Sequence, residues 1–133
     1  MDLLQTTLQR YYGWSSFRSG QRPVVESLLA GKDCLAVLPT GGGKSLCYQL
    51  PALVRAGLVV VISPLVALME DQVLQLRRRG IEAACLHGGI EPGQRRRILE
   101  QIDAGTLRLL YLAPERLQGE ATRSLLQEQA ASG

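Results

Sequence analysis

Between the apolar run Cys34-Leu35-Ala36-Val37 and an amphipathic segment lies the octapeptide Leu38-Pro39-Thr40-Gly41-Gly42-Gly43-Lys44-Ser45. This order predicts a strand over 34–38, a loop, and a helix that begins at Lys44. Consecutive glycines allow positive φ values and a close approach to a ligand, so that successive backbone N–H groups can surround an anion. A glycine-rich linker is the alternative, but a linker would not join a buried strand to a helix start. The octapeptide therefore predicts a phosphate-binding loop.

The last two residues of the octapeptide indicate the ligand. Lys44 supplies a positive charge for the β- and γ-phosphates of a nucleoside triphosphate, and Ser45 supplies a hydroxyl ligand for Mg²⁺. Lys44 and Ser45 are therefore the candidate catalytic residues, and Ser45 is the candidate metal ligand. The full set of predicted phosphate-binding residues comprises Thr40, Gly41, Gly42, Gly43, Lys44 and Ser45. Leu38 stands where the general phosphate-binding motif has glycine. This departure narrows the class of nucleotide-binding protein more than it weakens the prediction of a phosphate site.

Length and composition predict one soluble, globular domain. The chain has 133 residues, of which 46% are hydrophobic and 20% charged. The longest apolar stretch, 57–69, is interrupted by Ser63 and Pro64 and is too short to span a bilayer. The first residues lack the basic flank and the apolar centre of a signal peptide. We therefore expect a cytoplasmic protein with no membrane partner.

The charge of the chain permits a nucleic-acid partner without requiring one. A net charge of +3 is compatible with a polyanion but too small to decide the matter. The arginine runs at 77–79 and 95–97 lie on expected helices, where charge runs are usually solvated faces rather than DNA contacts.

The cysteines predict neither a disulfide framework nor a metal site. Cys34, Cys47 and Cys85 are odd in number, and neither they nor the single histidine, His87, have metal-ligand spacing. Each cysteine has apolar neighbours in the sequence. We expect all three to be small core residues in a reducing compartment.

Apolar periodicity and turn residues predict the order of secondary structure. A first helix is expected to end at Gly13, and a second to begin near Pro23 and end at Gly31. Strands are then expected over 34–38, 58–62, 82–86 and 107–112, alternating with helices over 44–54, 65–79, 91–104 and 121–130. This alternation predicts an α/β fold in which a parallel sheet is sandwiched by helices.

In a parallel sheet the loops that follow the strands gather at one edge, where ligands bind. The expected loops are the phosphate-binding loop, 63–65, 86–89 and 113–116. Ser63-Pro64 and Pro114-Glu115 are typical of helix starts, and this capping role accounts for them without a ligand. Helix starts also bind anions, so the same residues could hold phosphates of a nucleic acid. His87, in the third loop, is expected to be exposed.

Four segments follow one another in a recognisable order. They are Tyr12-Gly13-Trp14 with Phe17-Arg18-Ser19-Gly20-Gln21 (motif 0), Pro39-Thr40-Gly41-Gly42-Gly43-Lys44-Ser45 (motif I), Val61-Ile62-Ser63-Pro64-Leu65-Val66-Ala67-Leu68-Met69-Glu70-Asp71-Gln72 (motif Ia) and Tyr111-Leu112-Ala113-Pro114-Glu115-Arg116-Leu117 (motif Ib). With these residues, nearly the whole chain closely resembles the N-terminal part of RecQ-family DNA helicases. Those proteins are superfamily 2 enzymes with two RecA-like lobes.

The resemblance implies the cofactor and the residues around it. It implies ATP with Mg²⁺, bound by an incomplete RecA-like lobe of the phosphate-binding-loop class at 32–133. An N-terminal helical segment at 1–31 would carry the adenine-recognition motif 0. Within that motif, Trp14 would stack on adenine, Arg18 would frame the nucleotide, and Gln21 would read the adenine edge, for which a carboxamide offers a donor and an acceptor.

The resemblance also implies a DNA partner. Motifs Ia and Ib contact single-stranded DNA in such helicases, which makes the DNA-binding candidates Ser63, Pro64, Leu65, Pro114, Glu115 and Arg116. The implied partners are a single-stranded track, a duplex fork and the remainder of the helicase chain. The implied setting is DNA repair and recombination in the cytoplasm, at the nucleoid if the source is bacterial.

The leading hypothesis is the ATP-binding portion of an ATP-dependent 3′–5′ DNA helicase that couples ATP hydrolysis to DNA translocation and unwinding. The sequence reaches Gly133 before an Asp-Glu-Ala-His motif or a second lobe with its arginine finger, so we expect no catalysis by this chain alone. The alternative is a non-catalytic regulatory module that binds nucleotide or DNA. A DEAD-box RNA helicase is disfavoured, because that group has Pro-Thr-Arg-Glu-Leu where this chain has Ser-Pro-Leu-Val-Ala-Leu.

Overall fold

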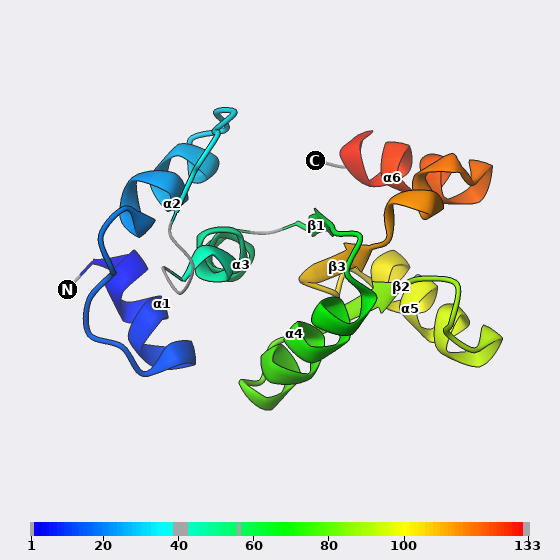
Figure 1. Ribbon diagram of the computed structural model, residues 1–133, viewed down its shortest axis with the longest axis horizontal. Coiled ribbons are helices and arrows are strands. Elements are labelled where there is room, and N and C mark those ends of the chain that lie inside the picture. The colour runs from blue at the N-terminus through cyan, green and yellow to red at the C-terminus, as the bar shows by residue number, and fades with distance from the viewer. Residues whose placement is uncertain (1, 39–42, 56, 132–133) are drawn as a thin grey trace. The chain divides into compact units, whose positions relative to one another are not determined.

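The computed structural model describes residues 2–38, 43–55 and 57–131 (Figure 1). These residues fall into two compact units, one from Met1 to Val59 and one from Val60 to Gly133. In Figure 1 the first unit is coloured from blue to teal and the second from green to red.

The first unit is helical. It contains α1 (Leu3–Tyr12), α2 (Gln21–Leu29) and α3 (Lys44–Val54), and α3 packs against both of the others. Its core consists of apolar side chains from all three helices: Leu4, Leu8, Tyr12, Val25, Leu46 and Leu50. Residues four apart lie on one face of a helix, so the spacing within α1 and within α3 directs these side chains to one common core.

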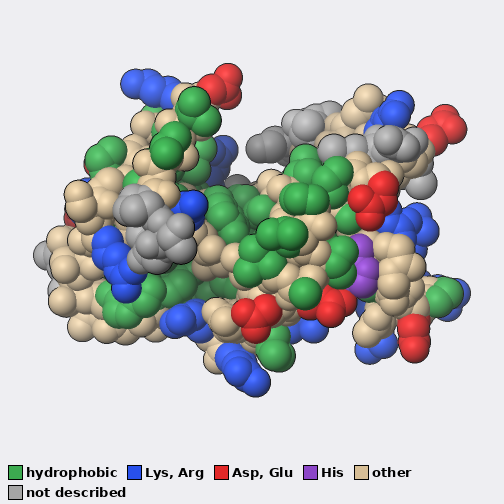
Figure 2. Space-filling model, in the orientation of Figure 1, with side chains coloured by type: hydrophobic (Ala, Val, Ile, Leu, Met, Phe, Trp, Pro, Cys, Tyr) green, Lys and Arg blue, Asp and Glu red, His purple; other side chains and the backbone are tan. Residues whose placement is uncertain are grey.

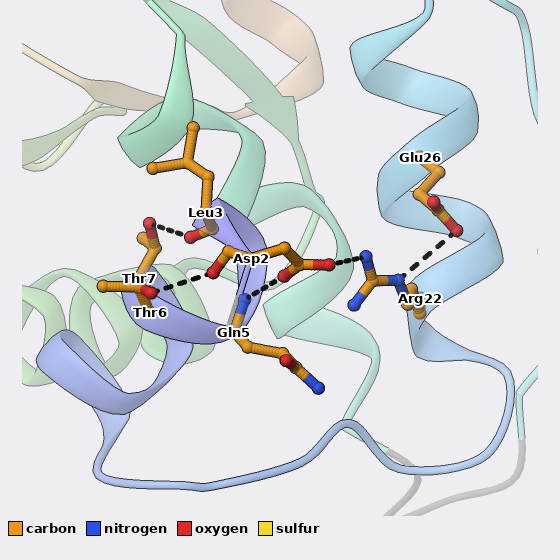
Figure 3. A network of polar contacts seen from close by, with 7 residues as sticks. All are labelled: Asp2, Leu3, Gln5, Thr6, Thr7, Arg22 and Glu26. Carbon is orange, nitrogen blue, oxygen red and sulfur yellow. Dashed lines mark hydrogen bonds and ion pairs between the residues drawn. The ribbon is translucent and has the colours of Figure 1, made fainter.

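A polar network fastens the start of α1 to the first turn of α2 (Figure 3). Asp2 is the N-cap of α1, and its Oδ1 accepts a hydrogen bond of 2.9 Å from the Gln5 N–H. The guanidinium of Arg22 donates to the other carboxylate oxygen of Asp2 and lies 3.6 Å from Glu26 Oε1. The hydrogen bond from Arg22 holds the pKa of the Asp2 carboxyl below its ordinary value. Asp2 therefore caps one helix while its charge is matched from another.

The second unit contains most of a three-stranded sheet with the order β1 (Val59–Ile62), β3 (Leu109–Leu112), β2 (Ala83–Leu86). Strands β2 and β3 run parallel, with Ala83 opposite Leu109 and Leu86 opposite Leu112. All four residues of the central strand β3 are buried, as expected of an apolar run in the middle of a parallel sheet.

Helices complete the second unit. They are α4 (Val66–Arg78), α5 (Pro92–Ala104), the 3-10 helix η1 (Pro114–Gln118) and α6 (Glu120–Ala131), and α4 packs on β2. Figure 2 shows hydrophobic side chains on the face of the molecule in view. Among the described side chains of this unit, the large apolar ones that are exposed are Ile62, Leu65, Leu68 and Leu74. Among the described residues, no helix is both long enough and apolar enough to cross a bilayer.

The sequence predictions of the α/β class and of most elements are confirmed. The three strands and the helices α3 to α6 lie within two residues of their expected bounds. Gly105, which ends α5, has a φ of 73°, a left-handed conformation that glycine adopts without steric cost. The arginine runs at 77–79 and 95–97 lie on helices, and apart from the half-buried Arg95 they are exposed, as expected.

The predicted strand at 34–38 is wrong. This stretch has no regular secondary structure, and Leu35 and Val37 are 93% and 89% exposed. A strand depends on hydrogen bonds from a neighbour, and no strand of the described chain pairs with this stretch. The expectation of a buried Cys34 fails with it, since this cysteine is exposed, whereas Cys47 is buried and Cys85 half-buried.

The start of α4 also differs from the prediction. Leu65, not Ser63, is the N-cap of the helix, and the helix begins at Val66. The Ser63 Oγ accepts a hydrogen bond of 3.2 Å from the Leu65 N–H. This bond forms a turn ahead of the helix, so Ser63 and Pro64 stay in the loop that follows β1.

Replacement of a core leucine should destabilise the first unit far more than the same replacement at the surface. Leu50→Ala should lower the free energy of unfolding by about 2–5 kcal/mol, because Leu50 is fully buried. The matched control, Leu35→Ala, should change it by less than about 0.5 kcal/mol. Urea unfolding followed by the fluorescence of Trp14, the single tryptophan, measures both. Equal effects would contradict this core.

Candidate nucleotide and nucleic-acid sites

The start of α3 carries the residues expected to bind phosphate. Lys44 and Ser45 are the first two residues of the helix, and the Lys44 side chain is exposed. Gly43 is the N-cap with a φ of 76°. Backbone N–H groups at a helix N-terminus attract anions, so the position of Lys44 suits a phosphate ligand. Pro39, Thr40, Gly41 and Gly42 lie outside the described residues.

Gln21 joins motif 0 to the start of α3. Its side chain is fully buried. Its Oε1 accepts a hydrogen bond of 2.8 Å from the Arg18 N–H, and its Nε2 donates one of 3.0 Å to the Gly43 carbonyl. A Cβ at position 43 would lie 2.2 Å from Gln21 Nε2. Gly43 is therefore required both by its positive φ and by the close approach of this amide.

Trp14 lies on the same unit with part of its ring exposed. The ring stacks on Tyr12, with 5.5 Å between centroids and 27° between planes, and is 40% exposed. The Tyr12 hydroxyl donates a buried hydrogen bond of 2.7 Å to Gln49 Oε1 on α3. The Arg18 guanidinium lies 5.8 Å from the centroid of the Trp14 ring. Trp14, Arg18, Gln21 and Gly43 thus form one chain of contacts that ends beside Lys44.

Three of the four loops predicted to share one edge of the sheet, those that follow β1, β2 and β3, lie there. The Ser63 N–H donates to the Leu112 carbonyl at 3.0 Å, and the Ala113 N–H donates to the Leu86 carbonyl at 3.2 Å. These bonds continue the strand pairing into the loops. The DNA-binding candidates Pro64, Leu65, Pro114 and Glu115 are exposed there, while Ser63 and Arg116 are half-buried.

His87 corrects the prediction of an exposed loop residue. It is only 6% exposed. Its Nδ1 accepts a hydrogen bond of 3.0 Å from the Gly89 N–H, and its Nε2 lies 2.7 Å from Glu70 Oε1 on α4. Since Nδ1 is an acceptor, the ring proton is on Nε2, which donates to the Glu70 carboxylate. The Arg116 Nη2 donates to the His87 carbonyl at 2.7 Å.

Sequence reasoning missed this network because no motif marks it. Glu70 and Arg116 lie 17 and 29 residues from His87 in the chain. The sequence offered one signal for this network, the position of the three residues in the chain. All three belong to elements that follow the ends of parallel strands. That signal placed His87 at the edge but gave no partner for it.

The same region contains the donor atoms of a conceivable metal site, which spacing in the sequence did not reveal. Ligand atoms of Glu70, Cys85 and His87 lie within 4.8 Å of one another. A metal on His87 Nε2 would move the ring proton to Nδ1, at which the Gly89 N–H already points. Burial, and then the charge of Glu70, raise the pKa of the Cys85 thiol and oppose its ionisation. Hydrogen bonds therefore account for this cluster better than a metal does.

The Gln21 contact should be sensitive to the loss of one donor. Gln21→Glu keeps an acceptor for the Arg18 N–H but places a carboxylate oxygen against the Gly43 carbonyl. We expect the free energy of unfolding to fall by about 1–3 kcal/mol, the cost of a buried polar group left without its partner. The control is Gln9→Glu on the exposed face of α1, and urea unfolding is the measurement. No difference between the two variants would refute the contact.

Comparisons with known proteins identify the family of this chain. Residues 18–130 match the family model described as DEAD/DEAH box helicase. The chain is 52% identical over 125 residues to "ATP-dependent DNA helicase RecQ" of Synechocystis sp., covering 94% of this chain and 26% of that protein. It is 50% identical over 119 residues to "Probable ATP-dependent DNA helicase RecS" of Bacillus subtilis, covering 89% and 24%.

Similarity extends to an animal protein. The chain is 45% identical over 118 residues to "Putative ATP-dependent DNA helicase Q1" of Caenorhabditis briggsae, covering 87% of this chain and 19% of that protein. The chain thus spans about a quarter, or less, of the length of these relatives. The order of the motifs, the α/β structure and the family match agree. The chain belongs to the DEAD/DEAH box helicase family, and RecQ helicases are among the relatives that it resembles.

Proposed function

We propose that this chain is the ATP-binding portion of an ATP-dependent 3′–5′ DNA helicase, which couples ATP hydrolysis to translocation along DNA and to unwinding. The observation that supports it most directly is the start of α3. There Lys44 is exposed in the first turn, directly after a glycine whose positive φ and close contact with Gln21 fix the approach to the helix. The names of the RecQ relatives supply the activity of the whole protein.

In this proposal the first turn of α3 binds the triphosphate. Lys44 holds the β- and γ-phosphates as a point charge, and the helix N-terminus adds its positive end. Ser45 would provide a hydroxyl ligand for Mg²⁺. When bound, that ion neutralises the charge that develops on the phosphates. The backbone of Thr40, Gly41 and Gly42 would complete the cradle.

Adenine recognition falls to motif 0. The Trp14 ring is partly exposed and stacks on Tyr12, which supports a role in stacking on adenine. Arg18, close to that ring, would border the base. The amide of Gln21 is already hydrogen-bonded to the backbone of Arg18 and of Gly43. Binding of adenine at Gln21 would therefore also affect the phosphate-binding segment, through the same side chain. Residues 1–31 would thus supply the base site, and 32–133 the partial lobe.

Single-stranded DNA is the proposed ligand of the sheet edge in the second unit. Pro64, Leu65, Pro114 and Glu115 are exposed on adjacent loops, and backbone groups in such loops can hold successive phosphates. Arg116 would add a positive charge beside them. The further partners would be a duplex fork and the rest of the helicase chain, in the cytoplasm.

Hydrolysis needs groups that the 133 residues do not include. A helicase of this kind uses the aspartate and glutamate of an Asp-Glu-Ala-His motif to hold Mg²⁺ and to activate water, and this sequence contains no such run. We therefore propose that the 133-residue chain binds nucleotide without turning it over.

Nucleotide binding should depend on one of the two lysines in the chain. Lys44→Ala should weaken the binding of Mg-ATP by about 10- to 100-fold, since it removes a charge-assisted contact to phosphate. Lys32→Ala, the matched control, replaces the other lysine and should leave affinity unchanged. Titration of a fluorescent ATP analogue gives both constants. Equal affinities for the two variants would contradict the assignment of the phosphate site.

The full-length protein should unwind DNA with a defined polarity, whereas the 133-residue chain alone should not hydrolyse ATP. The full-length natural protein should unwind a duplex with a 3′ single-stranded tail and not one with a 5′ tail, in gel assays with ATP. The 133-residue chain should release no phosphate above the background of its Lys44→Ala variant. Unwinding from the 5′ tail would overturn the polarity, and Lys44-dependent turnover by the short chain would overturn its proposed inactivity.

A further inference from the structure

We propose that His87 is a positioning residue that sets the geometry of the DNA-binding edge, so that affinity for single-stranded DNA depends on it although its ring does not touch DNA. The inference rests on the proposed function, because it concerns the same sheet edge. It adds a residue that neither the motifs nor the family match assigns to the site.

His87 is bonded from three elements. Its ring donates to Glu70 on α4 at 2.7 Å and accepts from the Gly89 N–H within its own loop at 3.0 Å. Its carbonyl accepts from Arg116 on η1 at 2.7 Å. The helix after β1, the loop after β2 and the short helix after β3 are thereby fixed to one residue.

The loop after β2 needs such a fixed point. Among the described residues, the backbone bonds that continue the sheet reach Ser63 and Ala113, and the loop after β2 adds one long backbone bond of its own, from the Ile90 N–H to the His87 carbonyl at 3.5 Å. Beyond Leu86 the loop continues with Gly88 and Gly89, which bring no side chain of their own and carry a large conformational entropy. A Cβ at Gly89 would lie 3.0 Å from His87 Cε1, so the loop backbone is folded closely against the ring.

His87 is better placed to hold the edge of the sheet than to bind a ligand. The side chain is buried, and both ring nitrogens already have partners. Glu70, by contrast, has a side chain that is 56% exposed. The bond between them is charge-assisted and so is stronger than one between neutral groups. It links the buried ring to the helix that follows the motif Ia loop.

Variants of His87 can keep the hydrogen bond of one ring nitrogen while they remove that of the other. His87→Asn places an amide oxygen near the position of Nδ1, so it can keep the bond from Gly89 but loses Glu70. His87→Gln places an amide nitrogen near the position of Nε2, so it can keep the bond to Glu70. Glu70→Ala breaks the same link from the exposed side, without change to the buried ring. Glu100→Ala, on the exposed face of α5, is the matched control.

The measurement is the affinity of the full-length natural protein for fluorescein-labelled oligothymidine, by fluorescence anisotropy. His87→Asn and Glu70→Ala should each weaken binding by about tenfold, within the range of coupling between residues in contact. The double variant should be no weaker than either single one. His87→Gln should bind more tightly than His87→Asn, and all variants should keep the wild-type affinity for ATP.

The outcomes separate this inference from the proposed function. If the wild type binds oligothymidine and Glu70→Ala binds it equally well, the positioning role of His87 is refuted while the proposed function stands. Losses in the double variant that multiply would also refute it, since the two residues would then act independently. A wild-type protein that fails to bind oligothymidine would overturn the proposed function and this inference together.

Discussion

The central strand β3 bonds to a neighbour on each side, and the second unit depends on this pairing. Because β2 runs parallel to it in a register that sets Leu86 opposite Leu112, the two strands end at the same level. Ser63 continues the pairing from the other side through the Leu112 carbonyl. Three loops from distant parts of the chain are thus brought to one edge by backbone geometry alone. The side chains there can then be chosen for ligand contact or for bonds to one another.

The first unit relies on a different constraint, the close approach of a buried amide to a glycine. Gln21 Nε2 lies 3.0 Å from the Gly43 carbonyl, in the space that any Cβ would fill. A glycine at this place therefore does more than allow a tight turn, because it also admits the side chain that joins motif 0 to α3. A residue expected to read a base and a residue expected to cradle a phosphate are in direct contact, and in the proposed function this contact would couple the two ends of the nucleotide site.

Local signals in the sequence predicted most helices and strands. The contacts that sequence analysis missed depend on hydrogen bonds between residues far apart in the chain. The β-branched run at 59–62 and Gly105 act through neighbours in the chain, so their strand and helix end could be predicted. The stretch 34–38 has the composition of a strand, but composition measures the capacity for burial and not the presence of a partner. The buried state of His87 and the contact of Gln21 with Gly43 depend on residues 17 to 29 positions away. No periodicity could reveal them.

Arg116 shows how structural and ligand-binding roles can coincide in one side chain. The resemblance implied that Arg116 contacts DNA, and in the structure its Nη2 donates a hydrogen bond to the His87 carbonyl. These assignments do not compete, because a guanidinium has five N–H donors in a rigid plane. With one donor bonded to the loop after β2, the rotational freedom of the guanidinium is reduced before any phosphate arrives. A contact prepared in this way loses less side-chain entropy on binding than one from an arginine without such a bond, so the network around His87 would act on DNA through the arginine that it orients.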